Sequence, residues 1–565
     1  MIKILLVNVP GGRVPTDYPP IAISRIIEGV APELDCRISF YNLDLLRPTF
    51  DQILKRIRAD RPQVIGFSAI LTPTYKYLKD LSLLLKKEFP EIPQVLGGEM
   101  SVIHKLVLTN SAVDFCVIGQ AEPAFSALLG ALRAGDFSAA DKGQFMGIKG
   151  LAFINRGEPF FTGEQAETTD AATRQINYEL LAEFTDIRQY IHEVGGRYYR
   201  DRIAPSEIDG FFSLFQPDNL GRNLATVFTS KGCVGRCSFC HRYFKGYKVI
   251  NCETLMEYIS HISAKHNVGM LLFQVEDFGT DAAATARLTD FLKGSGLNWA
   301  APAVRVKTCS DEKLRAWKEA GCVNVNFGIE SCSQKMLDVM EKGVRVEENL
   351  NALRLCNKHR LATIISLVIG MPGETEATIE ETIANLATVI PDDIGMVYEL
   401  SINFFQAVPG TAGYEFARHM GLIPSDPKGE EKYIEGLHEA VANEISHYLN
   451  FTDYEKEEVL YWKDYIQLEL LAAYLRKHGR LKVLRLKKSK RFQYAAVYGL
   501  LPHAARKFLF KYYIVLRYYK LKGLLDLLKR KLLHKRPAVY SGIDRSLRLI
   551  NKDFEAGKPW PTLKN

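Results

Sequence analysis

The chain has 565 residues, a formal net charge of +8 and hydrophobic residues at 47% of its positions, so it is long enough to form several globular domains. No apolar run reaches the roughly 18 residues that a membrane-spanning helix needs, which argues against an integral membrane protein. Met1 to Val9 carries one lysine in a short apolar stretch typical of a strand rather than of a signal peptide, so we expect a reducing, cytoplasmic environment.

Residues 1–162 are predicted to form a doubly wound, Rossmann-like α/β domain. Runs with the composition of buried parallel strands alternate with helical segments; they are Ile2–Asn8, Val64–Ser68, Gln94–Gly97 and Phe115–Gly119. Ligands of such sheets bind beyond the carboxyl ends of the strands. A dinucleotide is disfavoured because Gly11 and Gly12 lead into Arg13 rather than into a G-x-G-x-x-G turn.

Residues 163–222 contain acidic and aromatic pieces with few regular patterns, and we expect a linker from the first domain to the entrance of the next. Residues 223–423 are predicted to form a partial (β/α) barrel of the TIM type. Strand-like runs such as Met270–Phe273 and Val323–Phe327 alternate there with helical stretches such as Asp311–Ala320, which implies parallel strand pairing. The predicted strand ends carry charged residues that could face a substrate or form ion pairs, namely Glu276, Asp277 and Arg305.

Cys233, Cys237 and Cys240 lie within eight residues. The C-x3-C-x2-C spacing lets one loop supply three thiolates to a [4Fe-4S] cluster and leaves the fourth iron open. A structural zinc site is the alternative, but such a site normally has four ligands, and only the adjoining His241 could complete it. A disulfide would leave one of the three thiols over. The other cysteines are scattered, and we interpret them as inert buried thiols.

The cysteine run resembles the signature of the radical S-adenosylmethionine (SAM) superfamily, including its aromatic-Cys ending, Phe239-Cys240. Later segments resemble further motifs of the superfamily in the same order; they are Phe327–Ser331, Met340–Gly343, Gly370–Thr375 and Val408–Thr411. The resemblance implies that the three cysteines hold the cluster and that Phe239, Glu330 and Ser331 contact the bound cofactors. Without the resemblance, Glu330 is equally well explained as a solvated carboxylate at a strand end.

The loops of the first domain resemble those of the cobalamin-binding domain found in many radical SAM enzymes. Tyr18–Ser24 matches its Pro-Pro helix entry, and Lys149–Phe153 resembles its closing strand. The resemblance implies that cobalamin is bound by Ser68, Leu71, Gly97, Gly98 and Gly119. The Asp-x-His-x-x-Gly loop that supplies a lower cobalt ligand elsewhere is absent, and we interpret His104, on a predicted helix, as structural.

Residues 424–565 are predicted to form a basic, mainly helical region that matches no known motif. From Arg476 to Arg536 there are 20 Lys or Arg residues and a single acid, Asp526. Three explanations stay open. The helices could cover the barrel with basic stems over apolar surface, lie on an anionic membrane surface, or bind nucleic acid, although no RNA-binding module is recognisable.

By resemblance, the chain is expected to be a cobalamin-dependent radical SAM enzyme. An electron from a donor such as flavodoxin or ferredoxin would cleave SAM to a 5'-deoxyadenosyl radical, methylcobalamin would methylate the substrate at an unactivated carbon, and a second SAM would remethylate the cobalamin. Relatives also use these two domains for oxidative cyclisation or rearrangement. The alternative from another class is a redox or RNA-binding protein with a structural cluster.

The basic, aromatic C-terminal region favours a hydrophobic substrate, such as a lipid or a tetrapyrrole, over a small polar metabolite. It also allows peripheral contact with the inner face of the membrane.

Overall fold

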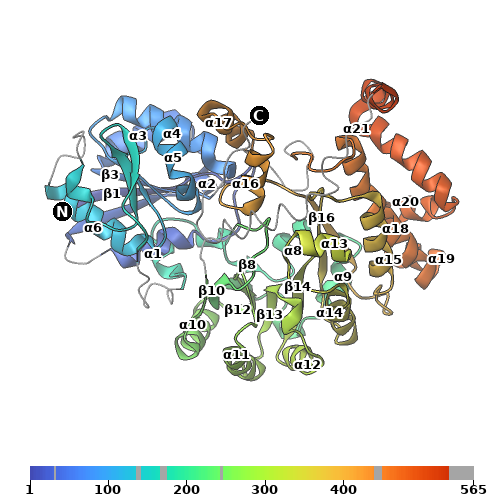
Figure 1. Cartoon of the computed structure of the whole chain (residues 1–565). Coiled ribbons are helices and arrows are strands. Elements are labelled where there is room, and N and C mark those ends of the chain that lie inside the picture. Colours follow the sequence, from blue (N-terminus) through green and yellow to red (C-terminus); the bar gives the residue numbers. More distant parts are fainter. Residues whose placement is uncertain are drawn as a thin grey trace.

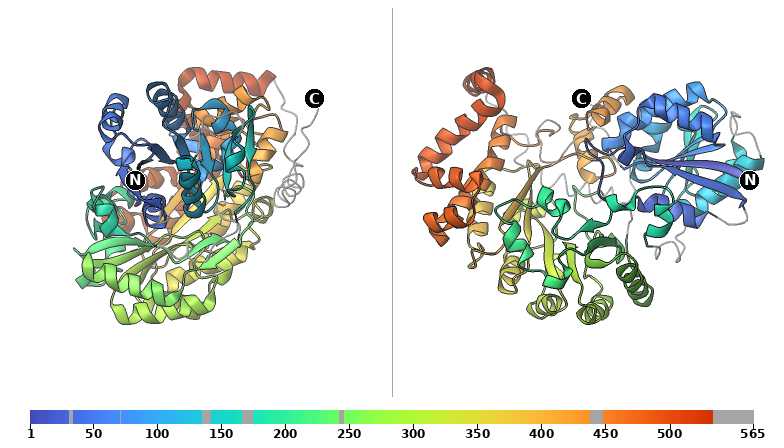
Figure 2. Two further views of the ribbon diagram at one scale, coloured as in Figure 1. Left: turned by 90° about the vertical axis from the view of Figure 1, so that its left-hand side faces the viewer. Right: turned by 180° about the vertical axis from the view of Figure 1, so that it is seen from behind.

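The computed structural model describes residues 1–30, 34–70, 72–134, 142–165, 175–241, 246–437 and 448–533. Two seven-stranded sheets and a group of C-terminal helices follow one another across the molecule (Figure 1). The view from behind shows the same order, reversed from left to right (Figure 2, right). The fold class is therefore α/β with a helical C-terminal region, as predicted.

The first sheet is doubly wound. Its strand order is β2-β1-β3-β4-β5-β6-β7, and its strands are β1 (Ile2–Asn8), β2 (Cys36–Tyr41), β3 (Val64–Ser68), β4 (Gln94–Gly97), β5 (Phe115–Val117), β6 (Leu151–Asn155) and β7 (Glu158–Phe161). The strands from β2 to β5 pair in parallel, and β6 and β7 continue the sheet in antiparallel pairing. The helices of this part are α1 (Ile21–Gly29), α2 (Leu43–Leu46), α3 (Phe50–Asp60), α4 (Tyr75–Glu88), α5 (His104–Asn110) and α6 (Ala121–Ala134).

The two faces of this sheet belong to different hydrophobic clusters because successive strand side chains point in opposite directions. Ile4 and Leu6 of β1 pack in the cluster that contains Leu128 of α6. Leu5 and Val7 pack in the cluster that contains the buried residues of α3 and α4. Helices on both faces leave the carboxyl edge of the strands open to a ligand.

The second sheet forms the curled, open wall of a half-barrel, with helices on its outer side (Figure 1). Its order is β16-β15-β14-β13-β12-β9-β8, and its strands are β8 (His192–Glu193), β9 (Asn223–Val227), β12 (Val268–Phe273), β13 (Asn298–Val304), β14 (Cys322–Glu330), β15 (Ile364–Ile369) and β16 (Glu399–Phe404). All neighbours from β9 to β16 are parallel. The helices are α10 (Cys252–Lys265), α11 (Ala282–Ser295), α12 (Asp311–Glu319), α13 (Gln334–Val339), α14 (Val346–Lys358) and α15 (Glu376–Ala387).

The segment between the sheets leads from the first domain to the barrel, and much of it packs against the barrel strands. It starts at the first domain, where the Asn177 N–H donates to Ser24 Oγ (3.1 Å). Its aromatic side chains then pack at the amino ends of the barrel strands, where Phe211 shares a cluster with Leu224 and Met270. The segment contains α7 (Tyr178–Ala182), α8 (Arg197–Arg202) and α9 (Ile208–Phe212). Because it covers the amino ends, the carboxyl ends stay open.

Most of the C-terminal helices pack along one edge of the half-barrel, whereas the helix Pro427–Gly436 packs on α4 of the first domain. The C-terminal helices are α16 (Ala412–His419), α17 (Pro427–Gly436), α18 (Lys456–His478), α19 (Arg480–Leu486), α20 (Lys490–Tyr498) and α21 (His503–Leu533), the last of which changes direction at Lys520. Several of their basic residues pair with acids of the barrel and of α18; Lys507 and Lys511, for example, both lie within 3.2 Å of Glu376 oxygens. This pairing agrees with basic helices that cover the barrel. No helix among the described residues is long and apolar enough to span a membrane.

A buried network around Glu207 ties these helices to the segment that precedes the barrel. The Glu207 side chain has no exposed surface, and its carboxylate oxygens lie 2.5 Å from Lys487 Nζ and 3.0 Å from Arg491 Nη2. The Tyr398 N–H also donates to this carboxylate (3.0 Å). The sequence offered no signal for this anchor, because its members lie far apart along the chain.

We expect Glu207→Ala to lower the free energy of unfolding by about 3–5 kcal/mol, since it leaves the buried Lys487 ammonium without its counter-charge. Chemical denaturation followed by circular dichroism measures the change. Asp201→Ala, which removes an exposed pair with Arg197, is the matched control and should cost less than about 0.5 kcal/mol. Equal losses of unfolding free energy in both variants would show that the buried network stabilises the fold no more than an exposed ion pair does.

Candidate cofactor site

The cysteine loop extends from a two-stranded ribbon at the carboxyl end of β9. Cys233 is the last residue of β10 (Ser230–Cys233), which pairs antiparallel with β11 (Gly246–Val249). The loop turns tightly at Gly235, where an added Cβ would lie 3.3 Å from Cys233 Sγ and 3.8 Å from Cys237 Sγ. Glycine at this position therefore lets the two thiols flank the turn without a side chain between them.

Ser238 fixes the loop to two other motifs of the sequence. Its N–H donates to Met340 O (2.9 Å), and its hydroxyl donates to Val339 O (3.2 Å). Its own carbonyl accepts from the N–H of Gly413 in α16 (2.9 Å). The turn at Met340 and the start of α16, just after the Pro-Gly-Thr segment, thus position the cysteines, although both lie far from them along the chain.

Cations and carboxylates surround the thiols. Lys342 Nζ forms an ion pair with Glu330 (2.8 Å) and lies 5.9 Å from the centre of the Phe239 ring. Burial raises the pKa of the Cys237 thiol, and the Lys342 ammonium opposes this effect. Since thiolates are the ligands of iron, a nearby cation favours the ligating form. Lys342 is a site residue that the sequence analysis did not identify, although it lies in the Met340–Gly343 segment.

Asp277 and Arg305, predicted at strand ends, lie on the Cys233 side of the loop. Cys233 Sγ is 3.7 Å from Asp277 Oδ2. Burial raises the pKa of Cys233, and Arg305 lowers it. A Cβ at Gly235 would come within 3.0 Å of Arg305 Nη1, so the guanidinium lies against the loop. Asp277 is itself buried and accepts from the Thr280 hydroxyl (2.7 Å).

The donor set fits an iron-sulfur cube better than a single metal ion. Within the described part of the chain, no three His, Cys, Asp or Glu side chains come together closely enough to hold one ion. A cube instead binds each thiolate to a different iron, so the thiols remain apart. His241, the candidate fourth zinc ligand, lies against Gly410 of the Pro-Gly-Thr segment, where an added Cβ would be 3.0 Å from its ring.

The SAM contacts implied by the resemblance fall in two environments. Glu330 stands at the end of β14 with a left-handed backbone (φ 58°) and is held by Lys342 beside the cysteine loop. The Ser331 hydroxyl lies 3.1 Å from Thr382 Oγ1 and accepts from the Ser333 N–H (3.1 Å). Ser331 thus shapes the strand end from within the barrel wall, whereas Glu330 faces the loop.

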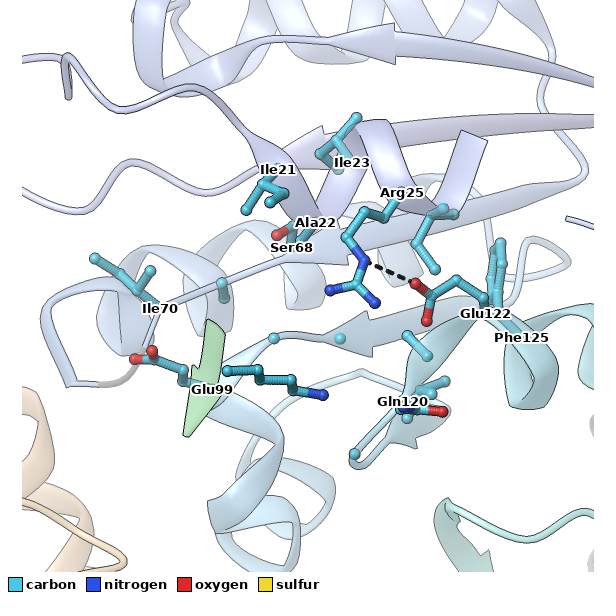
Figure 3. Close-up of a pocket in the computed structure, with 18 of the residues that line it drawn as sticks. Ile21, Ala22, Ile23, Arg25, Ser68, Ile70, Glu99, Gln120, Glu122 and Phe125 are labelled. Atoms are coloured by element: carbon cyan, nitrogen blue, oxygen red, sulfur yellow. Dashed lines mark hydrogen bonds and ion pairs between the residues drawn. The ribbon is translucent and has the colours of Figure 1, made fainter. Parts of the chain in front are cut away.

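A cavity of about 460 Å³ lies between the carboxyl ends of the two sheets (Figure 3). The first domain contributes residues that follow β3, β4 and β5, and the barrel contributes Phe228, Lys231 and Glu276. Arg25 of α1 and Glu122 of α6 form an ion pair in its wall (2.9 Å; Figure 3). The sequence analysis did not identify this pair, because its members come from two helices that only the folded sheet brings together.

The predicted cobalamin residues collect at this cavity. It is lined by Ser68, Gly97, Gly98 and Gly119, whereas Leu71 lies outside the described residues. Gly98 has φ +89°, and a Cβ there would overlap the Ala69 carbonyl, so the turn after β4 requires glycine. His104 packs on Phe161 of β7 (ring centres 5.6 Å apart), in agreement with its structural interpretation.

Comparison with protein-family models identifies both the barrel and the first domain. The model of the radical SAM superfamily matches residues 227–386, and that of the B12-binding domain matches residues 7–129. The chain therefore combines a radical SAM domain with a cobalamin-binding domain. Its cofactors are a [4Fe-4S] cluster, SAM and cobalamin, as predicted.

Individual relatives are distant. An uncharacterized methyltransferase of Pyrococcus horikoshii is 25% identical over 75% of this chain and 84% of its own length. An anaerobic magnesium-protoporphyrin IX monomethyl ester cyclase of Cereibacter sphaeroides is 23% identical over 59% of this chain and half of its own length. The solved structure of the cobalamin-dependent SAM radical enzyme OxsB superposes with a TM-score of 0.56 over 98% of this chain and 79% of that one, at 14% identity. That likeness shows a shared fold.

We expect alanine at Cys233, Cys237 or Cys240 to prevent cluster binding, because each removes one of the thiolates of the loop. Iron and sulfide analysis of the anaerobically reconstituted protein measures the loss. Cys252→Ala, which removes a thiol on α10 that contacts Ala284 O, is the control and should keep its iron. A full complement of iron in the Cys237 variant would refute the assignment.

We expect Gly97→Leu to block cobalamin binding. Gly97 lines the cavity, and the atom nearest to an added Cβ is Phe67 O at 3.9 Å, so the new side chain enters free space. Cobalamin absorbance retained after gel filtration measures binding. The exposed Gly147, which has no atom within 4 Å of an added Cβ, gives the control Gly147→Leu. If both variants retain cobalamin as the wild type does, the cofactor binds elsewhere.

Proposed function

We propose that this cobalamin-dependent radical SAM enzyme methylates an unactivated carbon of a hydrophobic substrate of the lipid or tetrapyrrole class. The observation that carries the proposal is the cavity shared by the two domains. Loops of the cobalamin-binding domain line one side of it, and the other side includes Ser230, Lys231 and Gly232, the residues that lead directly into Cys233. Both cofactors would therefore act on one cavity.

The relatives support a choice between two reactions. The alignment with the Pyrococcus horikoshii methyltransferase extends over 84% of that protein, which favours methyl transfer. The cyclase of Cereibacter sphaeroides acts on a magnesium-protoporphyrin ester by its name, and it aligns over half of its length. This relative supports a tetrapyrrole-like substrate, and it makes oxidative cyclisation the second candidate reaction.

In this proposal the residues of the chain bind and position the cofactors. Cys233, Cys237 and Cys240 would hold the cluster, and Ser238 would keep their loop at the carboxyl ends of the strands through its bonds to Val339, Met340 and Gly413. When bound, the cluster, SAM and cobalamin supply the radical and methyl-transfer chemistry. Lys342 and Arg305 would balance the negative charge of the thiolates.

The cavity wall would keep water away and orient a large amide-rich ligand. Ile21, Phe125 and Val275 provide apolar surface around the opening between the sheets. Arg25 and Glu122 neutralise each other, so their wall offers hydrogen-bonding atoms without net charge. Such a surface suits the neutral amide side chains of cobalamin better than it suits a phosphate-rich dinucleotide.

Radical SAM enzymes need an external electron, so the proposal includes a donor such as flavodoxin or ferredoxin. We also propose that the enzyme lies in the cytoplasm, where reduced thiols persist.

We expect the reduced, anaerobically reconstituted protein to convert SAM to 5'-deoxyadenosine, because a cluster held by Cys233, Cys237 and Cys240 would supply the electron for reductive cleavage. Liquid chromatography measures the product. Cys237→Ala should form none, whereas Gly97→Leu should still cleave SAM. A wild-type protein with a fully loaded cluster and no cleavage would favour a structural cluster instead.

Mass comparison of lipid and pigment extracts from cells with and without the gene tests the reaction itself. We expect a species heavier by one methylene group than its precursor only in cells with the gene. A product that differs by oxygen and hydrogen, without added carbon, would replace methylation by oxidative cyclisation.

A further inference from the structure

α19 and α20, with the turns that join and follow them, carry exposed apolar and basic residues, here together called the α19–α20 face. Its apolar residues are Leu481, Leu486, Tyr494, Val497 and Leu500. Its basic residues are Lys482, Arg485, Lys488 and Lys490. We propose that this face binds the surface of an anionic lipid bilayer.

The apolar residues of the face are exposed because the opposite sides of the helices are used for packing. Phe492, Ala495 and Tyr498 are fully buried where α20 packs on α18. By helical geometry, Tyr494 and Val497 then point away from α18, and they are 64% and 65% exposed. A group of exposed apolar side chains indicates an interaction surface, whereas single exposed apolar residues are normal on any protein.

The charge of the face identifies the kind of partner. Residues 480–500 contain seven Lys or Arg residues and no acid. Three of these residues already have partners in the structure. Lys487 and Arg491 form ion pairs with the buried Glu207, and Arg480 donates a hydrogen bond to Gly499 O. The four basic residues of the face have no acidic partner among the residues that the structure describes. A negatively charged surface would complement them.

The apolar chemistry favours a bilayer over nucleic acid. Four of the five apolar residues, Leu481, Leu486, Val497 and Leu500, are aliphatic and offer no ring for stacking on a base. Aliphatic side chains that alternate with Lys and Arg instead suit the boundary between acyl chains and anionic headgroups. A helix pair that lies on a membrane surface places its aliphatic side chains among the acyl chains and its basic side chains near the anionic headgroups.

The position of the face is compatible with activity at a membrane. α18 to α21 lie at the end of the molecule away from the first sheet (Figure 1). A bilayer on the outer side of α19 and α20 would therefore leave the cavity between the two sheets uncovered. The inference does not depend on the proposed function, since it would hold for any reaction in that cavity.

Vesicle sedimentation with the full-length holoprotein tests the proposal. The protein should sediment with vesicles of phosphatidylcholine and phosphatidylglycerol and bind vesicles of phosphatidylcholine alone much more weakly. Each basic residue near an anionic surface strengthens binding roughly fivefold, so replacing Lys482, Arg485, Lys488 and Lys490 by Gln should weaken binding at least about a hundredfold.

A matched charge control uses exposed cations of the first domain. Lys55, Arg61, Lys87 and Lys105 changed to Gln remove the same charge far from α19 and α20. This variant should bind anionic vesicles as the wild type does. If both variants lose vesicle binding to the same extent, the binding depends on the overall charge of the protein and not on the α19–α20 face. That result would overturn the proposal. Circular dichroism and SAM cleavage verify that both variants are folded.

A second variant tests insertion separately from charge. Leu486→Gln, Val497→Gln and Leu500→Gln together should weaken vesicle binding while SAM cleavage stays unchanged. Unchanged vesicle binding in this variant would contradict the proposal. So would a wild-type protein that binds single-stranded RNA but not anionic vesicles, or one whose face is covered by a second copy, seen as a dimer that the three substitutions dissociate.

Discussion

Strands that pair in parallel all end at the same edge of their sheet, and this constraint governs the site of this protein. The first sheet directs Ser68, Gly97 and Gly119 toward one cavity. Lys231, in the ribbon that follows β9, and Glu276, which follows β12, line the same cavity from the other side. The aromatic segment at the opposite, amino ends closes the half-barrel where no cofactor is needed.

The position of the cysteine loop in turn depends on contacts with distant parts of the chain. Ser238 bonds to the turn at Met340 and to Gly413 of α16, so the loop is correctly placed only when the whole half-barrel has formed. The C-terminal helices support this arrangement through the buried Glu207, Lys487 and Arg491 network.

The regular elements could be predicted because their signal is local. The apolar runs at Ile2–Asn8 and Val64–Ser68 match β1 and β3 residue for residue, and the glycine turns follow from the same segments. The ion pair of Arg25 with Glu122 and the anchor at Glu207 could not be predicted. Each joins residues that only tertiary packing brings together. The packing of the aromatic segment at the amino ends of the barrel strands could not be predicted for the same reason, since its composition indicates burial but not against which end of the barrel.

The cluster and cobalamin are expected to face one common cavity. Pulsed electron paramagnetic resonance on the full-length protein, with the cluster reduced and cobalamin in its paramagnetic cobalt(II) state, can test this arrangement. We expect dipolar coupling between the two centres, and Gly97→Leu should abolish this coupling together with cobalamin binding. Two fully loaded centres without measurable coupling would mean that they lie apart, and the shared cavity would then not be the site of reaction.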